Sequence, residues 1–232
     1  MNRLPEAYRA VVLGASGAIG SALVAALQAD ARCTHVLAYS RNTHPGFELE
    51  DEVSMAACAA HAASHGPLHL VLDATGALYI DGQGPEKRLG ALDPQRLARA
   101  FAVNAIGPAL LLKHFVPLLA TDAPVVFATL SARVGSIEDN RTGGWYGYRA
   151  SKAALNMLLQ TTAIEAARTR PLAVFAALQP VTVASKLCGP FVDAADALTP
   201  AASAAGMLAA LDALHPTGRA QFVDYRGGMI PW

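Results

Sequence analysis

Short apolar runs and longer helical segments alternate along the whole chain. Each run is bounded by glycine, proline or polar residues, which is typical of a buried strand. The runs lie at 9–13, 35–39, 68–74, 124–130, 172–178 and 220–224, with a weaker candidate strand at 47–49. Helical patterns occupy 19–29, 51–64, 93–120, the stretch after Gly147, and 200–214. Strands that alternate with helices predict an α/β fold with a doubly wound parallel sheet.

Composition narrows the class of protein. The chain has 232 residues, enough for one large α/β domain over 1–232, and no linker or repeat divides it. Its net charge is zero, which argues against nucleic-acid binding. The three cysteines are far apart, as in proteins of a reducing compartment. Without a signal-peptide core or an apolar run of roughly 20 residues, we expect a soluble, cytoplasmic protein that does not bind membranes.

A glycine-rich loop follows the first strand directly and leads into a helix. Its residues are Gly14, Ala15, Ser16, Gly17, Ala18, Ile19 and Gly20. Small residues let the backbone approach a pyrophosphate, and the N-terminus of a helix attracts an anion. A tight turn with close helix–strand packing is the alternative, but this position after the first strand favours a dinucleotide site.

The end of the second strand bears on cofactor choice. An acidic residue here would bind the adenosine ribose and favour NAD. Ser40 stands there instead, followed by Arg41. A guanidinium suits the 2′-phosphate of NADP, so NADP is preferred over NAD, although Arg41 could also be an ordinary loop residue.

Tyr148 and Lys152 are four residues apart at the start of a helical segment. On a helix the two side chains share a face, and the ammonium would lower the pKa of the phenol. Such a tyrosine can exchange a proton with a carbonyl or alcohol oxygen. The same spacing also occurs by chance on solvated helices, so the rest of the chain has to support it.

Three further features come from other segments. Ser131 stands just beyond the strand at 124–130, at the sheet edge where ligands bind. Thr75-Gly76 ends the strand at 68–74, and glycine there lets the chain pass a flat ligand.

Pro108 has no N–H to donate to the carbonyl of Asn104. We therefore expect a helix kink that places a polar side chain and a freed carbonyl at one residue. Water alone could satisfy such a kink; a functional water is the other interpretation.

Histidines could suggest a metal site, and we reject one. His61 and His65 share a helix face, but no carboxylate or cysteine completes a ligand set. Their place in the last turn of the helix suits a C-terminus better.

Together these motifs resemble the short-chain dehydrogenase/reductase family over essentially the whole chain. Ala18 takes the place of the usual middle glycine of the cofactor loop, and Asp73-Ala74-Thr75-Gly76 that of Asn-Asn-Ala-Gly. Pro180-Val181 replaces Pro-Gly. The stretches 131–136 and 145–148 look most like the C-factor (C-signal)-like subgroup, one of whose proteins acts in cell–cell signalling.

The resemblance implies a Rossmann-type fold and assigns roles. It implies the catalytic residues Asn104, Ser131, Tyr148 and Lys152. The cofactor contacts that it implies are Gly14, Ser16, Gly17, Ala18, Ile19, Gly20, Ser40, Arg41, Glu48, Leu49, Ala74, Thr75, Gly76, Asn104, Tyr148, Lys152, Pro180, Val181, Thr182, Val183 and Ser185.

These residues predict an NADP(H)-dependent reductase of a small-molecule carbonyl, or dehydrogenase of the matching alcohol. The resemblance implies a homodimer or homotetramer. Ser131 would bind the substrate oxygen, Tyr148 transfer the proton, Lys152 hold the nicotinamide ribose, and Asn104 anchor a relay water. The segment 186–198 should cover the substrate. Arg133 and Trp145 are candidate lining residues, and each could equally be a packing or surface residue. A cofactor-binding signalling protein with little activity is an alternative, and a lyase or epimerase is a further one. The terminal Ile230-Pro231-Trp232 packs either on its own chain or on a neighbouring subunit.

Overall fold

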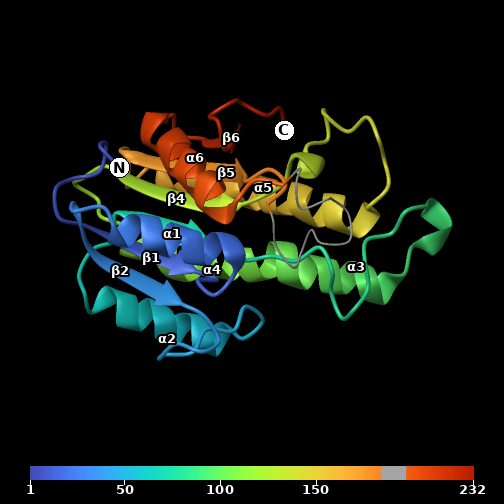
Figure 1. Ribbon diagram of the computed structural model, residues 1–232, viewed down its shortest axis with the longest axis horizontal. Helices are drawn as coiled ribbons and strands as arrows, with labels where there is room; N and C mark the ends of the chain where they lie inside the picture. The colour runs from blue at the N-terminus through green and yellow to red at the C-terminus, as the bar shows by residue number, and fades with distance from the viewer. Residues whose placement is uncertain (184–196) are drawn as a thin grey trace.

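Six parallel strands form one sheet in a computed structural model of the chain, which describes residues 1–183 and 197–232 (Figure 1). The strand order is β2-β1-β3-β4-β5-β6, so the chain reverses direction across the sheet between β1 and β3. The strands are β1 (Tyr8–Leu13), β2 (Cys33–Tyr39), β3 (Leu70–Asp73), β4 (Val125–Leu130), β5 (Ala173–Gln179) and β6 (Ala220–Asp224). A ligand crevice forms at such a reversal, outside the carboxyl ends of the strands. The predicted doubly wound sheet is confirmed.

Helices cover both faces of this sheet. They are α1 (Ala18–Gln28), α2 (Glu52–Ala63), α3 (Pro94–Phe101), α4 (Gly107–Phe115), α5 (Tyr146–Ala166) and α6 (Pro200–Ala213), with a π-helix, η2 (Ala102–Ile106), between α3 and α4. Short 3-10 turns lie at η1 (Leu89–Ala91), η3 (Val116–Leu118) and η4 (Arg133–Gly135). Helices α1 and α6 lie side by side on one face in Figure 1.

Side chains that alternate in direction along the strands form two apolar cores, one on each face of the sheet. In β1, Val12 faces α1 and α6, where it packs with Leu23 and Met207. Its neighbour Val11 points to the other face, into the cluster that holds Phe115 and residues of α2, α4 and α5. Successive side chains of a strand point to opposite faces, so each strand contributes to both cores.

The continuous helical stretch Pro94–Leu118 is long and apolar enough to cross a membrane by length and composition alone. Its residues Leu111 and Phe115 are fully buried in the core beneath the sheet. The stretch therefore packs as a core helix of an α/β protein.

The weak strand expected at Phe47–Leu49 is wrong. These residues form a loop between β2 and α2 that pairs with no strand, and the Phe47 N–H donates to the carbonyl of Ser40 at 3.0 Å. Phe47 is apolar because its side chain is buried in the core. The Ser54 hydroxyl bonds both the N–H and the carbonyl of Glu48, which uses main-chain groups that a strand would need.

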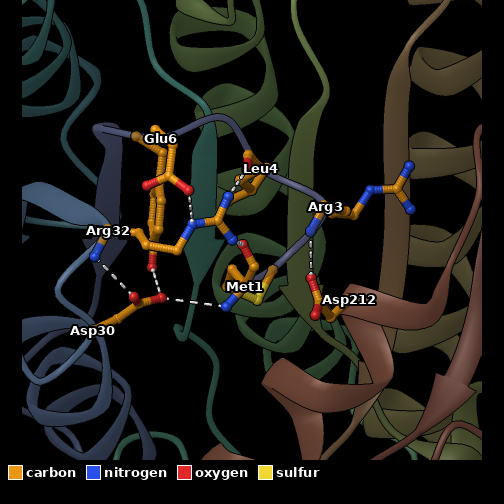
Figure 2. A network of polar contacts seen from close by, with 8 residues as sticks. Met1, Arg3, Leu4, Glu6, Asp30, Arg32 and Asp212 are labelled. Carbon is orange, nitrogen blue, oxygen red and sulfur yellow. Dashed lines mark hydrogen bonds and ion pairs between the residues drawn. The ribbon is translucent and has the colours of Figure 1, made fainter.

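The amino-terminal segment is held by a network of polar contacts (Figure 2). The Arg32 guanidinium donates to the carbonyls of Met1 at 2.7 Å and Leu4 at 2.6 Å. Asp30 accepts from the terminal amine and from the Tyr8 hydroxyl. This polar network anchors the residues before β1 and takes no part in the crevice.

The carboxyl-terminal residues pack on their own chain. Trp232 stacks on Phe222 with ring centroids 5.5 Å apart, and its carbonyl accepts from the Glu138 N–H at 3.0 Å. Ile230 is buried. Ile230 is thus buried within the chain, Trp232 stays 40% exposed, and packing on a neighbouring subunit stays a prediction.

Candidate active site

The glycine loop turns sharply from β1 into α1. The N–H groups of Gly14 and Ala15 both donate to the carbonyl of Tyr39 at 3.0 Å, which holds the loop against the end of β2. Gly14 has φ +80°, and a Cβ there would lie 2.9 Å from the Ala74 carbonyl oxygen. At Gly20 a Cβ would lie 2.2 Å from the Gly14 carbonyl oxygen. Both positions therefore require glycine.

The N-terminus of α1 opens toward the crevice. Gly17 is the N-cap and provides no side-chain hydrogen bond, so the first-turn N–H groups lack a capping partner. Ala18 is the first helical residue and lines the adjacent cavity. These free donors and the helix dipole suit the pyrophosphate of a dinucleotide, and alanine at 18 leaves the loop in place.

A cavity of about 620 Å³ runs along the carboxyl ends of β1, β3, β4 and β5. Its lining brings together predicted residues from five segments: Ser16, Gly17, Ala18, Ile19, Gly20, Ala74, Thr75, Gly76, Ser131, Tyr148, Lys152 and Pro180. Residues more than 100 positions apart thus meet around one space that the glycine loop and the Tyr148/Lys152 pair share.

Lys152 lies on the buried face of α5. Its ammonium donates to the carbonyl of Leu130, the last residue of β4, at 2.8 Å. Burial lowers the pKa of Lys152 to about 8, and the charge of Asp73 opposes this shift. The cation is therefore held at the sheet edge by one carbonyl, and the charge of Asp73 favours its protonated form.

Asp73 is a buried carboxylate at the end of β3. One of its oxygens accepts from the Thr75 N–H at 3.0 Å and from the Thr75 hydroxyl at 2.5 Å. The other accepts from the Thr129 hydroxyl at 2.6 Å. Asp73, where the family usually has asparagine, is thus held by Thr75 and Thr129, and its charge raises the pKa of Lys152.

Asn104 holds the chain immediately after Gly76. Its side-chain amide donates to the Ala77 carbonyl and accepts from the Ala77 N–H, both at 2.9 Å. A Cβ on Gly76, which has φ +119°, would lie 3.0 Å from both Asn104 Oδ1 and Lys152 Nζ. Glycine at 76 therefore lets Asn104 and Lys152 approach the same point.

The predicted kink at Asn104 is a π-helix. The Gly107 N–H bonds to the carbonyl of Ala102, five residues back. Pro108 provides no N–H, and its ring would clash with the carbonyl of residue 104 in a regular α-helix. The widened turn relieves that clash, and π-bulges are frequent at functional sites.

Ser131 and Tyr148 both line the cavity. Ser131 is buried, and its hydroxyl donates to Oδ1 of Asn156 at 2.6 Å. The rings of Trp145 and Tyr148 meet edge to face with centroids 6.2 Å apart. Trp145 adopts the left-handed conformation at the N-cap of α5, with φ 54°. Trp145 therefore packs against Tyr148, and its place in the substrate lining stays a prediction.

Other predicted contacts lie at the margin of the site. Arg41 is exposed beside the buried Ser40, after β2. A Cβ on Gly107 would lie 2.7 Å from Leu49 Cγ, so Leu49 packs on α4; Glu48 is exposed. Arg133 forms an ion pair with Asp139 at 3.0 Å, on the surface.

The segment after β5 keeps a glycine-like backbone at a residue that is not glycine. Val181 has φ 63°, a conformation that a β-branched residue seldom adopts. Thr182 and Val183 follow it, and Val183 forms a bridge with Leu198. Ser185 and most of the substrate-covering segment 186–198 lie outside the described residues.

Sequence reasoning missed two polar residues at the site, Glu86 and Asn156. Glu86 is buried, and one carboxylate oxygen accepts from the Gly147 N–H at 2.9 Å, in the first turn of α5. Asn156 lies four residues beyond Lys152 on α5. Glu86 also lines a second cavity, of about 480 Å³, which shares Ala77 and Tyr148 with the first. A polar residue at the spacing of Tyr148 and Lys152 on an otherwise apolar face was the available hint for Asn156.

The histidines expected at the end of α2 serve local contacts. His61 Nδ1 and the Tyr39 hydroxyl are 2.7 Å apart. In the part of the chain that the structure describes, no group of three or more His, Cys, Asp or Glu side chains could hold a metal ion.

The sequence is similar to those of known proteins. A family model described as enoyl-(acyl carrier protein) reductase matches residues 20–219. C-signal from Myxococcus xanthus is 35% identical over 169 residues, which cover 72% of this chain and 94% of that protein. A 1-hydroxy-2-glutathionyl-2-methyl-3-butene dehydrogenase from Rhodococcus sp. (strain AD45) is 31% identical over 189 residues, 81% of this chain and 79% of that protein.

Solved structures agree in fold. The NADPH-bound carbonyl reductase from chicken fatty liver superposes with a TM-score of 0.85 at 23% identity, covering 98% of this chain and all of that one. The identity to C-signal confirms the resemblance to the C-factor-like subgroup. The chain therefore belongs to the short-chain dehydrogenase/reductase family of NAD(P)-dependent oxidoreductases.

Proposed function

We propose that this protein is an NADP(H)-dependent oxidoreductase that interconverts a carbonyl and an alcohol on a small molecule, with Tyr148 transferring the proton. One observation carries the proposal. Ser131, Tyr148 and Lys152 line the same cavity as the glycine loop at the N-terminus of α1. A hydroxyl, a phenol and an ammonium thus converge where a dinucleotide would lie.

Each side chain has a separate task in this proposal. Ser131 holds the substrate oxygen, and Tyr148 gives that oxygen a proton during reduction or takes one during oxidation. The Lys152 cation stabilises negative charge on the phenol oxygen and binds the nicotinamide ribose. When bound, the reduced nicotinamide supplies the hydride. The main-chain carbonyl of Asn104 anchors a water that returns protons to Lys152.

NADP is the proposed cofactor. Arg41 is exposed at the end of β2, and the residue before it is Ser40 where an acid would favour NAD. A free guanidinium there can pair with a 2′-phosphate. The NADPH in the chicken carbonyl reductase, which has the same fold, supports this choice.

The substrate is a small carbonyl compound or alcohol. Two similar proteins are named for reactions of this kind. One is a carbonyl reductase, and the other is a dehydrogenase of a glutathionyl alcohol. Titration with NADPH and NADH, followed by NADPH oxidation with a panel of aldehydes and ketones, tests the proposal. We expect tight NADPH binding and turnover of at least one carbonyl compound.

A signalling role is the second candidate, because C-signal is 35% identical. The strained Val181 beside the nicotinamide site also favours it slightly. Tight NADPH binding with no oxidation on any carbonyl or alcohol would favour that candidate over the enzyme.

We further propose a homodimer or homotetramer in the cytoplasm. Met157, Leu158 and Ile164 are exposed on α5, and apolar groups gathered on a surface are typical of an interface. The free Cys33 and Cys58 suit a reducing compartment. Light scattering of the purified protein gives the oligomeric state, and a monomer at micromolar concentration contradicts it.

A further inference from the structure

Asn156 contacts the proposed substrate-binding serine directly. The Ser131 hydroxyl donates to Asn156 Oδ1 at 2.6 Å, and each residue is only 4% exposed. Asn156 lies on the stripe of α5 that carries Tyr148 and Lys152, because residues four apart share a helix face. The same helix therefore positions the phenol, the ammonium and the partner of the serine.

This hydrogen bond fixes what Ser131 can offer to a ligand. A serine hydroxyl has one proton and two lone pairs. In the arrangement observed, the proton points at Asn156, so toward the cavity Ser131 can only accept. A carbonyl substrate also only accepts, and the two oxygens cannot bond to each other. An alcohol, which has its own O–H, can donate to Ser131.

The other end of the amide provides a second arrangement. Asn156 Nδ2 is buried and has no hydrogen-bond partner among the described residues. A buried donor without a partner is costly, whereas an unpaired carbonyl oxygen is better tolerated. A flip of the Asn156 side-chain amide, which exchanges Oδ1 and Nδ2, would bring Nδ2 to Ser131 Oγ and leave Oδ1 unpaired. Ser131 would then accept from Asn156, and its proton would be free to donate to a carbonyl.

We propose that Asn156 is a positioning residue that sets the hydrogen-bond direction of Ser131, with the amide turned one way for a carbonyl ligand and the other way for an alcohol. The inference rests on the proposed carbonyl–alcohol chemistry. It assigns Asn156 no contact with the substrate.

Asn156→Asp is the sharpest test. An ionised carboxylate only accepts, so it holds the Ser131 proton and keeps it from the carbonyl. We expect kcat/KM for carbonyl reduction to fall about tenfold at a pH where the introduced carboxyl is ionised. Activity should recover as the pH falls and that carboxyl becomes protonated, because it can then donate to Ser131. Asn156→Leu, which cannot titrate, should lose activity without this recovery.

A double-mutant cycle separates positioning from a general effect on the fold. If Asn156 acts through Ser131, Asn156→Leu should lower activity in the wild-type background and cost nothing further in Ser131→Ala. Gln160→Leu is the matched control, because Gln160 lies one turn farther along α5 and bonds to the Ala220 N–H instead. We expect the control to lower thermal stability and to leave kcat/KM unchanged. NADPH titration of every variant reports whether the site remains folded.

An NMR measurement that does not depend on turnover distinguishes failure of this inference from failure of the proposed function. The side-chain amide signal of Asn156 in a ¹H–¹⁵N NMR spectrum, identified by its loss in Asn156→Leu, should shift in Ser131→Ala whether or not the protein turns over. If no carbonyl is reduced, the proposed function fails and this spectrum still decides the contact. An unmoved amide signal, equal losses from Asn156→Leu in both backgrounds, or a pH profile of Asn156→Asp parallel to that of the wild type would overturn the inference.

Discussion

The charge of the buried Asp73 side chain raises the pKa of Lys152, against the larger effect of burial, which lowers it. The cation is therefore lost as the pH rises through about 8. In the unfolded chain the lysine stays protonated up to its ordinary value of 10.5, so protonated Lys152 destabilises the fold and stability should increase between these two values.

Asp73→Asn removes the charge and keeps the shape. The pKa of Lys152 should fall below about 8, since burial then acts unopposed. The pH dependence of kcat/KM for NADPH, which reports the free enzyme, should therefore decline at lower pH than in the wild type. Asp51→Asn, at the N-cap of α2, is the control. Superimposed profiles for the wild type and Asp73→Asn would show that Asp73 does not act on Lys152.

Glu86 should matter to the start of the catalytic helix. Glu86→Ala leaves the buried N–H of Gly147 without its acceptor, and we expect the free energy of unfolding to fall by about 1–3 kcal/mol. Glu86→Gln keeps an acceptor for the Gly147 N–H, so the free energy of unfolding should fall less. The remaining loss comes chiefly from the missing attraction of a carboxylate to the helix N-terminus. Urea unfolding measures both, and equal stability of Glu86→Ala and the wild type would refute the contact.

Val181 should be a strained position. Val181 is a β-branched residue in a left-handed backbone conformation, and such strain costs about 1–3 kcal/mol of folding free energy. Val181→Gly removes this strain, and the entropy that glycine loses on folding costs less than the strain. We expect a melting temperature about 2–4 °C higher. The control Val183→Gly removes a buried side chain and should lower it. A lower melting temperature for Val181→Gly would mean that residue 181 is unstrained.

Arg41 should distinguish the two cofactors. Arg41→Ala is expected to raise the Kd for NADPH about tenfold, the loss of a charge-assisted hydrogen bond at an exposed site. The Kd for NADH should not change, because NADH has no 2′-phosphate. Arg141→Ala, another exposed arginine, is the control. Equal effects on both cofactors, measured by fluorescence titration, would rule out a 2′-phosphate contact.

The sequence was most informative where neighbouring residues set the structure. The glycine loop and the start of the helical pattern expected at 93–120 depend on contacts within a few residues, and both agree with the structure. The Asp93 side chain indeed accepts from the Arg96 N–H at 2.9 Å. The kink at Asn104 was likewise predictable, because Pro108 lacks an N–H.

Contacts between distant segments were not predictable. Glu86 meets Gly147 across 61 positions, and Ser131 meets Asn156 across 25. Nothing local marks such partners, since the fold alone brings them together. The error at Phe47–Leu49 has the same origin. An apolar residue such as Phe47 can be buried in a core without belonging to a strand, and only the tertiary structure decides which.

Tyr148→Phe tests the central claim most directly. It removes the hydroxyl that is proposed to exchange the proton and keeps the ring beside Trp145. The measurement is NADPH affinity beside the rate of NADPH oxidation with a carbonyl compound that the wild type reduces. We predict nearly unchanged affinity and a loss of turnover to background. Turnover equal to that of the wild type would contradict the assignment of Tyr148 as the proton donor.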